Sequence, residues 1–311
     1  MSGGDMTVAA IDCGTNSVRL LVARADADGG LADLDRRLIL TRLGQGVDAT
    51  GRFHPDALER TLAAFAEYAE VIERFGVERV RLVATSAARD ASNREEFFAG
   101  ARRLLGVDAE IISGDEEAAL SFRGALTALP DVATPALVMD IGGGSTELVL
   151  GSGGDTPSID HGLSLDIGSV RVRERFLAGD PPGAAQIATA SDYIDGLLDA
   201  SGVPFAEVAT WIGVGGTATS LSAVNQQLPV YDRAKVHAST MTRTDLHALA
   251  ERLLTSTVAQ VRELPSMHPK RADVICAGAL IADRVGRRVS VDLTISESDI
   301  LDGIALGLLG S

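Results

Sequence analysis

The sequence predicts an α/β protein of two domains, each built on a mixed sheet flanked by helices. Three observations indicate this fold class. The chain has 311 residues, which is long for a single hydrophobic core. Short apolar runs alternate with longer segments of helical periodicity. A block near the N-terminus recurs about midway along the chain, so the two halves are expected to fold alike.

The first half reads as strands followed by alternating helices and strands. Pro55 suits the first position of a helix and Gly76 the position after its end. Ser92 and Glu95 have the spacing of a capping box. The expected strands are 7–12, 19–26, 36–44, 80–87 and 109–113, and the expected helices are 55–76, 92–106 and 115–129.

The second half repeats the order of strands before helices. We expect strands at 135–140, 145–151, 158–165, 209–216 and 289–295, and helices at 167–178, 184–201, 217–225, 244–256, 270–287 and 299–309. A hairpin turn is expected at 151–158 and a hinge at 128–135. The predicted domains are 1–130, completed by the C-terminal helix at 299–311, and 131–298.

Composition excludes several classes of function. The net charge of −15 disfavours nucleic-acid binding through the overall field, so any anion site must be local. Two cysteines, Cys13 and Cys276, sit in separate apolar runs, which is typical of a reduced compartment. The first ten residues have no basic region of a secretory signal, and no apolar run is long enough to span a bilayer. We therefore expect a cytoplasmic protein that does not bind membranes.

The repeat pairs "IDCGTNSVRLLV" (11–22) with "MDIGGGSTELVL" (139–150). Asp12 corresponds to Asp140 and Ser17 to Ser145. Each block has an apolar strand ending in aspartate, a turn of small residues, and a second strand. The turns contain the candidate phosphate-binding residues, which are Gly14, Thr15, Asn16 and Ser17 in the first copy, and Gly142, Gly143, Gly144, Ser145 and Thr146 in the second.

Turns of this composition favour anion binding. Glycine allows the backbone to approach an anion closely, and successive N–H groups form a nest for it. The two turns would grip one phosphate from both sides, and Asp12 and Asp140 would hold a divalent cation, for which Mg²⁺ is the natural choice. The alternative is a pair of ordinary β-hairpins whose glycines only turn the chain.

With "GVGGTATSLSAV" (213–224), these turns resemble the superfamily that contains actin, a class of heat-shock chaperones and the sugar kinases. The segments "ATSAARDASN" (84–93), "ISGDEEA" (112–118) and "HPKRADVICAG" (268–278) narrow the likeness. In their order along the chain, the motifs resemble the exopolyphosphatase / guanosine pentaphosphate phosphohydrolase family in its short form. This resemblance implies two actin-like (ribonuclease H-like) domains with the active site in the interdomain cleft.

The family implies hydrolysis of the terminal phosphate of inorganic polyphosphate, with Mg²⁺ as cofactor and Mn²⁺ as its substitute. The expected partners are polyphosphate and a second copy of the chain in a homodimer, without nucleic acid or membrane. Two alternatives remain open from the sequence. One is hydrolysis of guanosine pentaphosphate, although the 4% aromatic content offers no evident platform for a base. The other is a non-hydrolytic actin-like nucleotide-binding sensor or kinase.

The resemblance also implies catalytic roles for three residues. Glu117, the acid directly before Ala118, matches the family's catalytic position, where it would accept a proton from the attacking water or orient it. Composition alone would read it as an ordinary acid in the first turn of a helix. Glu147 would join Asp140 around the cation or the water, and Arg89 would clamp the terminal phosphoryl group.

The remaining candidates would bind the phosphate chain. Ser86 and Asn93 would donate to phosphate oxygens or, alternatively, cap the next helix. Arg271, just before a long apolar helix, would hold the chain further from the cleaved bond. The glycine loop of Gly213, Gly215 and Gly216 would shape the cleft for the phosphate chain, and the weaker candidates for its path are Arg19 and Arg171. One departure from the family is Asp302, which stands in place of an arginine and puts that arginine's contact in doubt.

Overall fold

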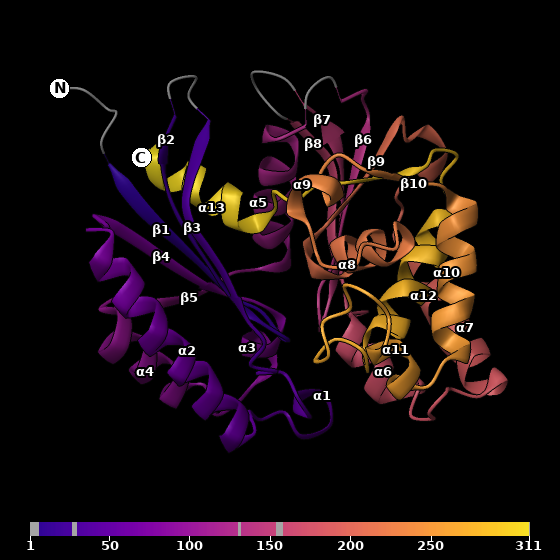
Figure 1. Ribbon diagram of the computed structural model, residues 1–311, viewed down its shortest axis with the longest axis horizontal. Helices are drawn as coiled ribbons and strands as arrows, with labels where there is room; N and C mark the ends of the chain where they lie inside the picture. The colour runs from indigo at the N-terminus through magenta and orange to yellow at the C-terminus, as the bar shows by residue number, and fades with distance from the viewer. Residues whose placement is uncertain (1–5, 27–29, 130–131, 154–157, 311) are drawn as a thin grey trace. The chain divides into compact units, whose positions relative to one another are not determined.

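The computed structural model describes the chain except for residues 1–5, 27–29, 130–131, 154–157 and 311 (Figure 1). Two compact units are present. Unit 1 comprises Met1–Thr127 and Asp299–Ser311, and unit 2 comprises Ala128–Ser298. Each unit contains one mixed sheet flanked by helices, so the fold class that the sequence predicts is confirmed.

Unit 1 is built on a five-stranded sheet of order β3-β2-β1-β4-β5. β1 is antiparallel to β2 and parallel to β4. The strands are β1 (Thr7–Cys13), β2 (Val18–Ala25), β3 (Leu31–Ile39), β4 (Arg79–Ala84) and β5 (Ala109–Ile111). The helices are α1 (Val47–Thr50), α2 (Pro55–Arg74), α3 (Ser86–Asp90), α4 (Glu95–Leu105), α5 (Gly114–Thr127) and α13 (Ile300–Leu309).

The two faces of this sheet pack against different helices. Ile11 and Leu20 belong to the core shared with α2 and α4, whereas Ala10 and Leu21 belong to the core shared with α13. Side chains alternate between the faces of a strand. Asp12 therefore projects on the same face as Ala10, which is the face that α13 covers.

Unit 2 has a six-stranded sheet of order β10-β11-β9-β6-β7-β8. The strands are β6 (Ala136–Ile141), β7 (Thr146–Ser152), β8 (Ser158–Leu165), β9 (Thr210–Val214), β10 (Thr240–Met241) and β11 (Leu293–Ile295). The helices are α6 (Ser169–Phe176), α7 (Ala184–Ala200), the 3₁₀-helix η1 (Phe205–Glu207), α8 (Gly215–Asn225), α9 (Arg233–Val236), α10 (Arg243–Thr255), α11 (Val258–Arg262) and α12 (Ile275–Gly286).

The two sheets share one topology. In each, an antiparallel three-stranded meander (β1-β2-β3 or β6-β7-β8) is extended on its first strand by parallel strands. β4 and β5 of unit 1 thus correspond to β9 and β11 of unit 2. The internal repeat seen in the sequence is therefore a repeat of structure, in which Asp12 and Asp140 are each the last residue but one of equivalent strands.

Several expected elements differ from the structure. The third strand lies at Leu31–Ile39 rather than at 36–44. Ser92 does not cap α4, since the cap position is Arg94 and the Ser92 hydroxyl donates to the Gly51 carbonyl oxygen at 2.9 Å. The helix expected at 270–287 begins only at Ile275. Residues 154–157, half of the expected turn at 151–158, lie outside the described residues.

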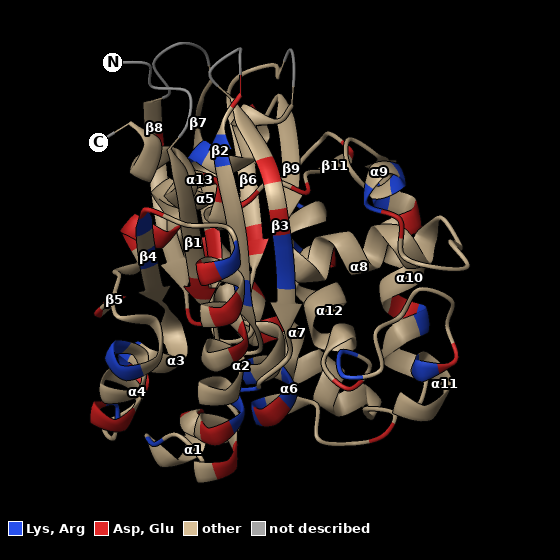
Figure 2. Ribbon diagram, turned by 60° about the vertical axis from the view of Figure 1, so that its left-hand side comes forward, with Lys and Arg blue, Asp and Glu red and all other residues tan. Residues whose placement is uncertain are grey.

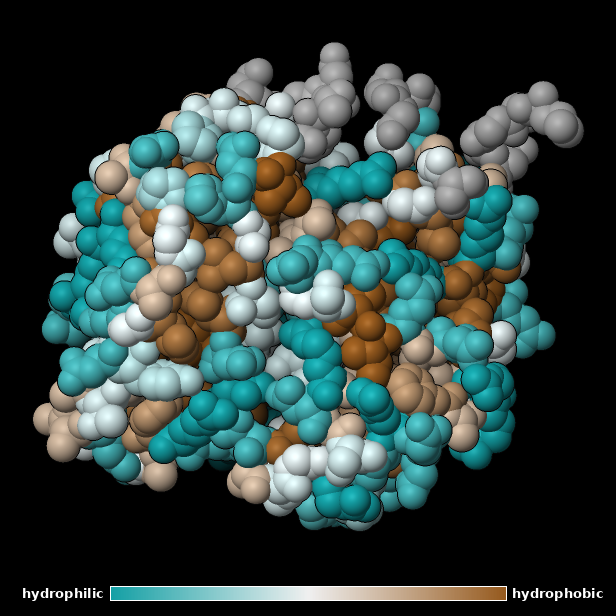
Figure 3. All heavy atoms as spheres, turned by 180° about the vertical axis from the view of Figure 1, so that it is seen from behind, coloured by the Kyte–Doolittle hydropathy of each residue, from teal (hydrophilic) through white to brown (hydrophobic). Residues whose placement is uncertain are grey.

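Charge is distributed unevenly among the elements, as Figure 2 shows. α8 has no charged residue, whereas β3 carries both arginines and aspartates. On the face drawn in Figure 3, hydrophobic and hydrophilic residues are intermixed. The exposed large hydrophobic side chains among the described residues are Leu38, Ile159, Val230 and Tyr231.

Within the described part of the chain, none of the helices has the length and apolar character that crossing a membrane requires.

Candidate active site

The turn between β6 and β7 is packed against the start of α6. The Gly142 carbonyl accepts from the Ser169 N–H at 2.8 Å, and the Gly143 carbonyl accepts from the N–H groups of Val170 at 2.9 Å and Arg171 at 3.0 Å. The Gly144 carbonyl accepts from the buried Arg171 side chain, whose Nε lies 2.8 Å away. Three consecutive carbonyls of the turn therefore point toward α6.

That arrangement fixes where the N–H groups of the turn point. In a trans peptide the N–H lies opposite the carbonyl of the preceding residue. The N–H groups of Gly143, Gly144 and Ser145 must then point away from α6. Among the hydrogen bonds of the described residues, none is donated by these three N–H groups. Together they have the character of an anion nest.

The turn between β1 and β2 is built in the same way. Its first glycine, Gly14, donates to the Ser17 carbonyl at 2.9 Å, and its counterpart Gly142 donates to Ser145 at 3.0 Å. The carbonyls of Thr15 and Asn16 accept from the backbone of the segment after β3, at 2.8 and 3.0 Å. The N–H groups of Asn16 and Ser17 consequently point away from that segment.

Asp140 and Glu147 stand opposite each other across the β6–β7 ladder, and Ser164 is opposite Glu147 across β7–β8. Residues directly opposite in an antiparallel pair project on the same face. Both acids are buried, and Glu147 accepts a hydrogen bond from the Ser164 hydroxyl at 2.7 Å. Glu147 therefore points to the side of the sheet on which Asp140 lies.

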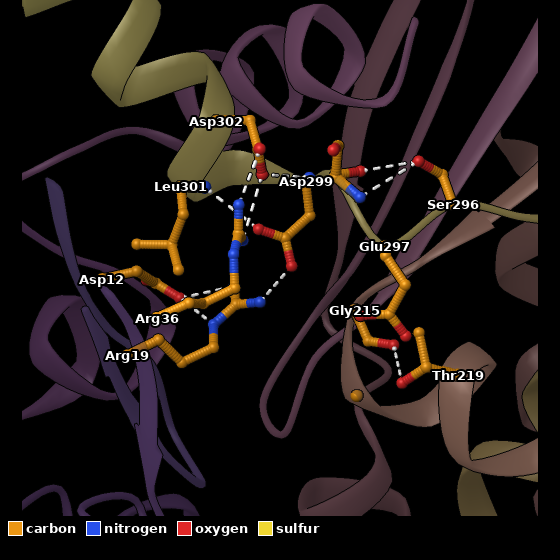
Figure 4. Close-up of polar contacts among 12 residues, drawn as sticks. Asp12, Arg19, Arg36, Gly215, Thr219, Ser296, Glu297, Asp299, Leu301 and Asp302 are labelled. Atoms are coloured by element: carbon orange, nitrogen blue, oxygen red, sulfur yellow. Dashed lines mark hydrogen bonds and ion pairs between the residues drawn. The ribbon is translucent and has the colours of Figure 1, made fainter. Parts of the chain in front are cut away.

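Asp12 has a different partner at the equivalent position, as Figure 4 shows. Arg19 lies opposite Asp12 in the ladder and donates to its Oδ2 from Nε at 3.0 Å and from Nη2 at 2.6 Å. Asp12 Oδ1 is buried and has no hydrogen-bond partner among the described residues. Burial raises the pKa of the Asp12 carboxyl, and the Arg19 guanidinium opposes that rise. Arg19 is thus neutralised by carboxylate rather than left open as a phosphate clamp.

Glu117 and Arg89 form an ion pair. Glu117 is 8% exposed in the first turn of α5, and its Oε2 accepts from Arg89 Nη1 at 2.9 Å. The same nitrogen donates to the Ile112 carbonyl at 3.0 Å. The structure therefore brings these two candidates together directly. The neighbouring Glu116 instead points outward and pairs with Arg81 at 2.7 Å.

Three further candidates, two in unit 1 and one in unit 2, are buried or bind the protein backbone. Asn93 binds the backbone of Phe53 through both amide atoms, at 2.7 and 3.1 Å, and caps no helix. Ser86 is buried at the start of α3, where the cap position is Thr85. In unit 2, the Thr146 hydroxyl donates to the Ile167 carbonyl rather than remaining open.

The start of α8 forms a second glycine-lined feature of unit 2. A Cβ on Gly215, which has φ of +73°, would lie 2.5 Å from Asp140 Oδ1. A Cβ on Gly216 would lie 2.3 Å from the Arg271 guanidinium nitrogens. Arg271 donates to the Gly216 carbonyl and, at 2.9 Å, to the Ser220 hydroxyl. These two glycines therefore admit an acid and a guanidinium group, whereas Gly213 packs inside the strand against Ala218.

The carboxylates of Asp12, Asp140 and Glu147 are the candidate ligands of a divalent cation. No group of three or more His, Cys, Asp or Glu side chains in the described ranges is disposed to hold a metal ion. Mg²⁺ usually takes only one or two protein carboxylates and completes its shell with water and phosphate oxygens. In unit 2, Asp140 beside Glu147 fits a cation of that kind, and in unit 1 the Oδ1 of Asp12, which has no hydrogen-bond partner among the described residues, could also contact one.

Sequence reasoning missed the residues that support these groups. Ser164 binds Glu147, Ser220 binds Arg271, and Asp299 binds Arg19. Gly168 is also structural, because a Cβ there would lie 2.3 Å from the Gly143 carbonyl carbon. Each supporting residue is distant in sequence from the group it contacts, so a local pattern cannot reveal it. Ser164 is the exception, because pairing the expected strands 145–151 and 158–165 as a hairpin would have placed it opposite Glu147.

Comparison with known proteins places this arrangement in a family. The model of the Ppx/GppA phosphatase family matches residues 21–310. Exopolyphosphatase 2 of Mycobacterium tuberculosis is 48% identical over 318 residues, covering 97% of this chain and 98% of that protein. The bifunctional 3-dehydroquinate synthase/phosphatase of Fusobacterium nucleatum is 32% identical, covering 96% of this chain and 46% of that protein.

Solved structures agree with this relationship. The Ppx/GppA family member of Aquifex aeolicus has a TM-score of 0.82 at 32% identity, covering 98% of this chain and 97% of that chain. A crystal structure of an exopolyphosphatase-like protein has a TM-score of 0.93 at 42% identity, with 97% of each chain covered. This chain therefore belongs to the Ppx/GppA phosphatase family.

Proposed function

We propose that this protein is an exopolyphosphatase, which hydrolyses the terminal phosphoric anhydride bond of inorganic polyphosphate. The observation that carries the proposal is the 48% identity, over nearly the whole chain, to a protein named Exopolyphosphatase 2. The two glycine turns, with their outward N–H groups, supply what a polyanionic substrate needs. The guanosine pentaphosphate reading has no comparable support.

Phosphoryl transfer to water requires a positioned phosphate, neutralised charge and an oriented water. We assign the N–H groups of residues 143–145 and 16–17 to the phosphate oxygens. Arg271 would contact a phosphate further from the cleaved bond, since its side chain lies against Gly216 and Ser220 of α8.

Glu117 would orient the attacking water and receive its proton. Its pairing with Arg89 supports a refined role for that arginine, which is to hold Glu117 in place as well as to contact the terminal phosphate. Two further donors on the Arg89 guanidinium are suited to a phosphate oxygen. Burial of Glu117 keeps bulk water from competing for the carboxylate.

Asp140 and Glu147 would hold a divalent cation, Mg²⁺ or Mn²⁺, with Asp12 as a weaker contact. The cation would neutralise charge on the transferred phosphoryl group when bound. Asp140 and Glu147 lie directly opposite each other on one face of the sheet. This placement supports the assignment, since carboxylate oxygens are the ligands that such cations prefer.

We also propose that the two units are the actin-like domains 1–130 with 299–311 and 131–298, and that the protein acts as a homodimer in the cytoplasm. The buried, free thiols of Cys13 and Cys276 suit a reduced compartment. Sedimentation equilibrium of the purified protein tests the dimer, and fractionation of cells tests the compartment.

Phosphate release tests the function. Purified protein would be assayed with polyphosphates of graded length, guanosine pentaphosphate and ATP, with and without Mg²⁺. We expect Mg²⁺-dependent release from polyphosphate, and a loss of about 10²–10⁴-fold in kcat for Glu117→Gln. Glu116→Gln is the matched control, because Glu116 is adjacent but pairs with Arg81. Release from guanosine pentaphosphate alone, or full turnover by Glu117→Gln, would contradict the proposal.

A further inference from the structure

A chain of ion pairs in unit 1 connects the first hairpin to the start of α13 (Figure 4). Arg19 lies between Asp12 and Asp299, and Arg36 binds Asp302 from Nη2 at 2.7 Å. The three carboxylates are 4–5% exposed. Burying a charged group costs free energy unless its partners are well placed, so the stability of unit 1 depends on the geometry of these ion pairs.

The two oxygens of Asp12 have different surroundings. Oδ2 accepts from two nitrogens of Arg19, whereas Oδ1 has no hydrogen-bond partner among the described residues. A buried carboxylate oxygen without a partner costs free energy, which a ligand of that oxygen would recover. Arg19 therefore decides which oxygen of Asp12 stays open.

Arg19 is held from its other side by Asp299. Its Nη1 donates to Asp299 Oδ2, while Nε and Nη2 donate to Asp12. A planar guanidinium bound by carboxylates at both ends has little freedom to rotate. Without Asp299, Arg19 could swing and accommodate either oxygen of Asp12.

Asp299 itself is fixed by two helices. Its Oδ1 accepts from the Leu301 N–H at 3.0 Å, and its N–H donates to Asp302 Oδ2 at 2.9 Å, which caps α13. Its backbone packs on α5, since a Cβ on Gly124 would lie 1.8 Å from the Asp299 carbonyl oxygen. α5 also carries Glu117, so one crossing of helices sets the position of both groups.

We propose that Asp299 is a positioning residue, which acts through Arg19 to keep Oδ1 of Asp12 open to the catalytic cation. The inference rests on the proposed function, which gives Asp12 a cation contact. Neither Asp299 nor Arg19 needs to touch the cation or the phosphate chain. Their contribution is to hold one carboxylate in one orientation.

The test compares Asp299→Asn with Asp302→Asn in the full chain. Both replace one carboxylate of the same capping box by an amide, and each breaks a pair with one arginine. Asparagine can still accept the Leu301 N–H, so the cap of α13 is retained. Only Asp299→Asn alters the arginine that contacts Asp12, because Arg36 binds Asp302 and Asp33.

Mn²⁺ would be titrated into each protein without substrate, and free Mn²⁺ measured by electron paramagnetic resonance. We expect Asp299→Asn to weaken Mn²⁺ binding about tenfold, as changes to residues that orient metal ligands do. Asp302→Asn should change it less than about twofold. In phosphate release, Asp299→Asn should raise the Mg²⁺ requirement and leave the KM for polyphosphate unchanged. Equal Mn²⁺ affinities of the two variants, or no Mn²⁺ binding by the wild type, would overturn the inference.

A second measurement does not depend on metal. The Nε–H resonance of Arg19, assigned by its loss in Arg19→Lys, should exchange with solvent faster in Asp299→Asn than in the wild type or Asp302→Asn. Unchanged exchange would show that Asp299 does not hold Arg19. If the wild type released no phosphate, the proposed function would fail, while Mn²⁺ binding and Nε–H exchange would still decide the role of Asp299.

Discussion

The two hairpins, 11–22 and 139–150, share a turn but differ in the residue that faces the aspartate. Gly14 and Gly142 make the same turn hydrogen bond, at 2.9 and 3.0 Å. Opposite the aspartate, however, the first hairpin has Arg19 and the second has Glu147. The first aspartate faces an arginine with which it forms an ion pair, whereas the second faces another acid. The same backbone turn is therefore flanked by different charges in the two copies.

The largest expected effect comes from breaking the neutralised pair. Arg19→Gln would leave Asp12 and Asp299 as buried carboxylates without their shared partner. Removal of one member of a buried ion pair typically costs about 3–5 kcal/mol. We expect the free energy of unfolding, measured by urea denaturation, to fall by about that amount. A decrease of less than about 1 kcal/mol in the free energy of unfolding would show that the ion pairs of Arg19 contribute no more than solvent-exposed ones do.

The corresponding substitution in the second hairpin is Glu147→Gln, which removes one of the two facing carboxylates. Under the proposed assignment, phosphate release should fall about 100-fold, because the cation and the water would lose a carboxylate. Steady-state kinetics check this, and urea denaturation of the same preparation establishes that the variant is folded. A folded variant that kept full activity would contradict our assignment of Glu147.

A third prediction concerns the segments that support the two turns. A Cβ on Gly168 would meet the backbone of Gly143 at 2.3 Å, whereas one on Gly44 would meet the side-chain Cγ2 of Thr15 at 2.2 Å. A side chain can rotate away, but the backbone of a turn cannot. We expect Gly168→Ala to cost about 2–3 kcal/mol of stability and Gly44→Ala less than about 1 kcal/mol. Equal losses in thermal denaturation would contradict this.

The smallest expected effect concerns the orientation of Glu147. Ser164→Ala removes the hydroxyl that donates to Glu147 at 2.7 Å. A hydrogen bond to a charged group contributes about 1.5–3 kcal/mol, but water can partly replace a hydroxyl in a partly buried position. We expect kcat to fall about five- to tenfold, equivalent to about 1 kcal/mol, and the free energy of unfolding to fall by no more than about 1 kcal/mol. Ser158→Ala at the far end of β8 is the control and should have no effect.

Much of the fold could be predicted because it is encoded locally. The alternation of strands and the helix signals at Pro55 and Gly76 depend on neighbouring residues, and the structure confirms both ends of α2. The predicted range of the third strand was wrong because the sequence of β3, "LADLDRRLI", is half-buried and rich in charge. The more apolar run at 36–44 therefore matches the pattern of a strand better. Ser92 failed as a cap because the Gly51 carbonyl competes for its hydroxyl.

For the candidate site, the sequence alone determined the repeat, its two aspartates and its glycine turns, because backbone conformation and residue spacing are written in consecutive residues. Only the tertiary structure decided how these groups are used. It paired Arg19 with Asp12, turned Glu147 toward the side of Asp140, and placed Arg89 on Glu117. It also recruited Asp299, 280 residues from Arg19 along the chain. Ion pairs between distant segments depend on how sheets and helices pack, and no local pattern records that packing.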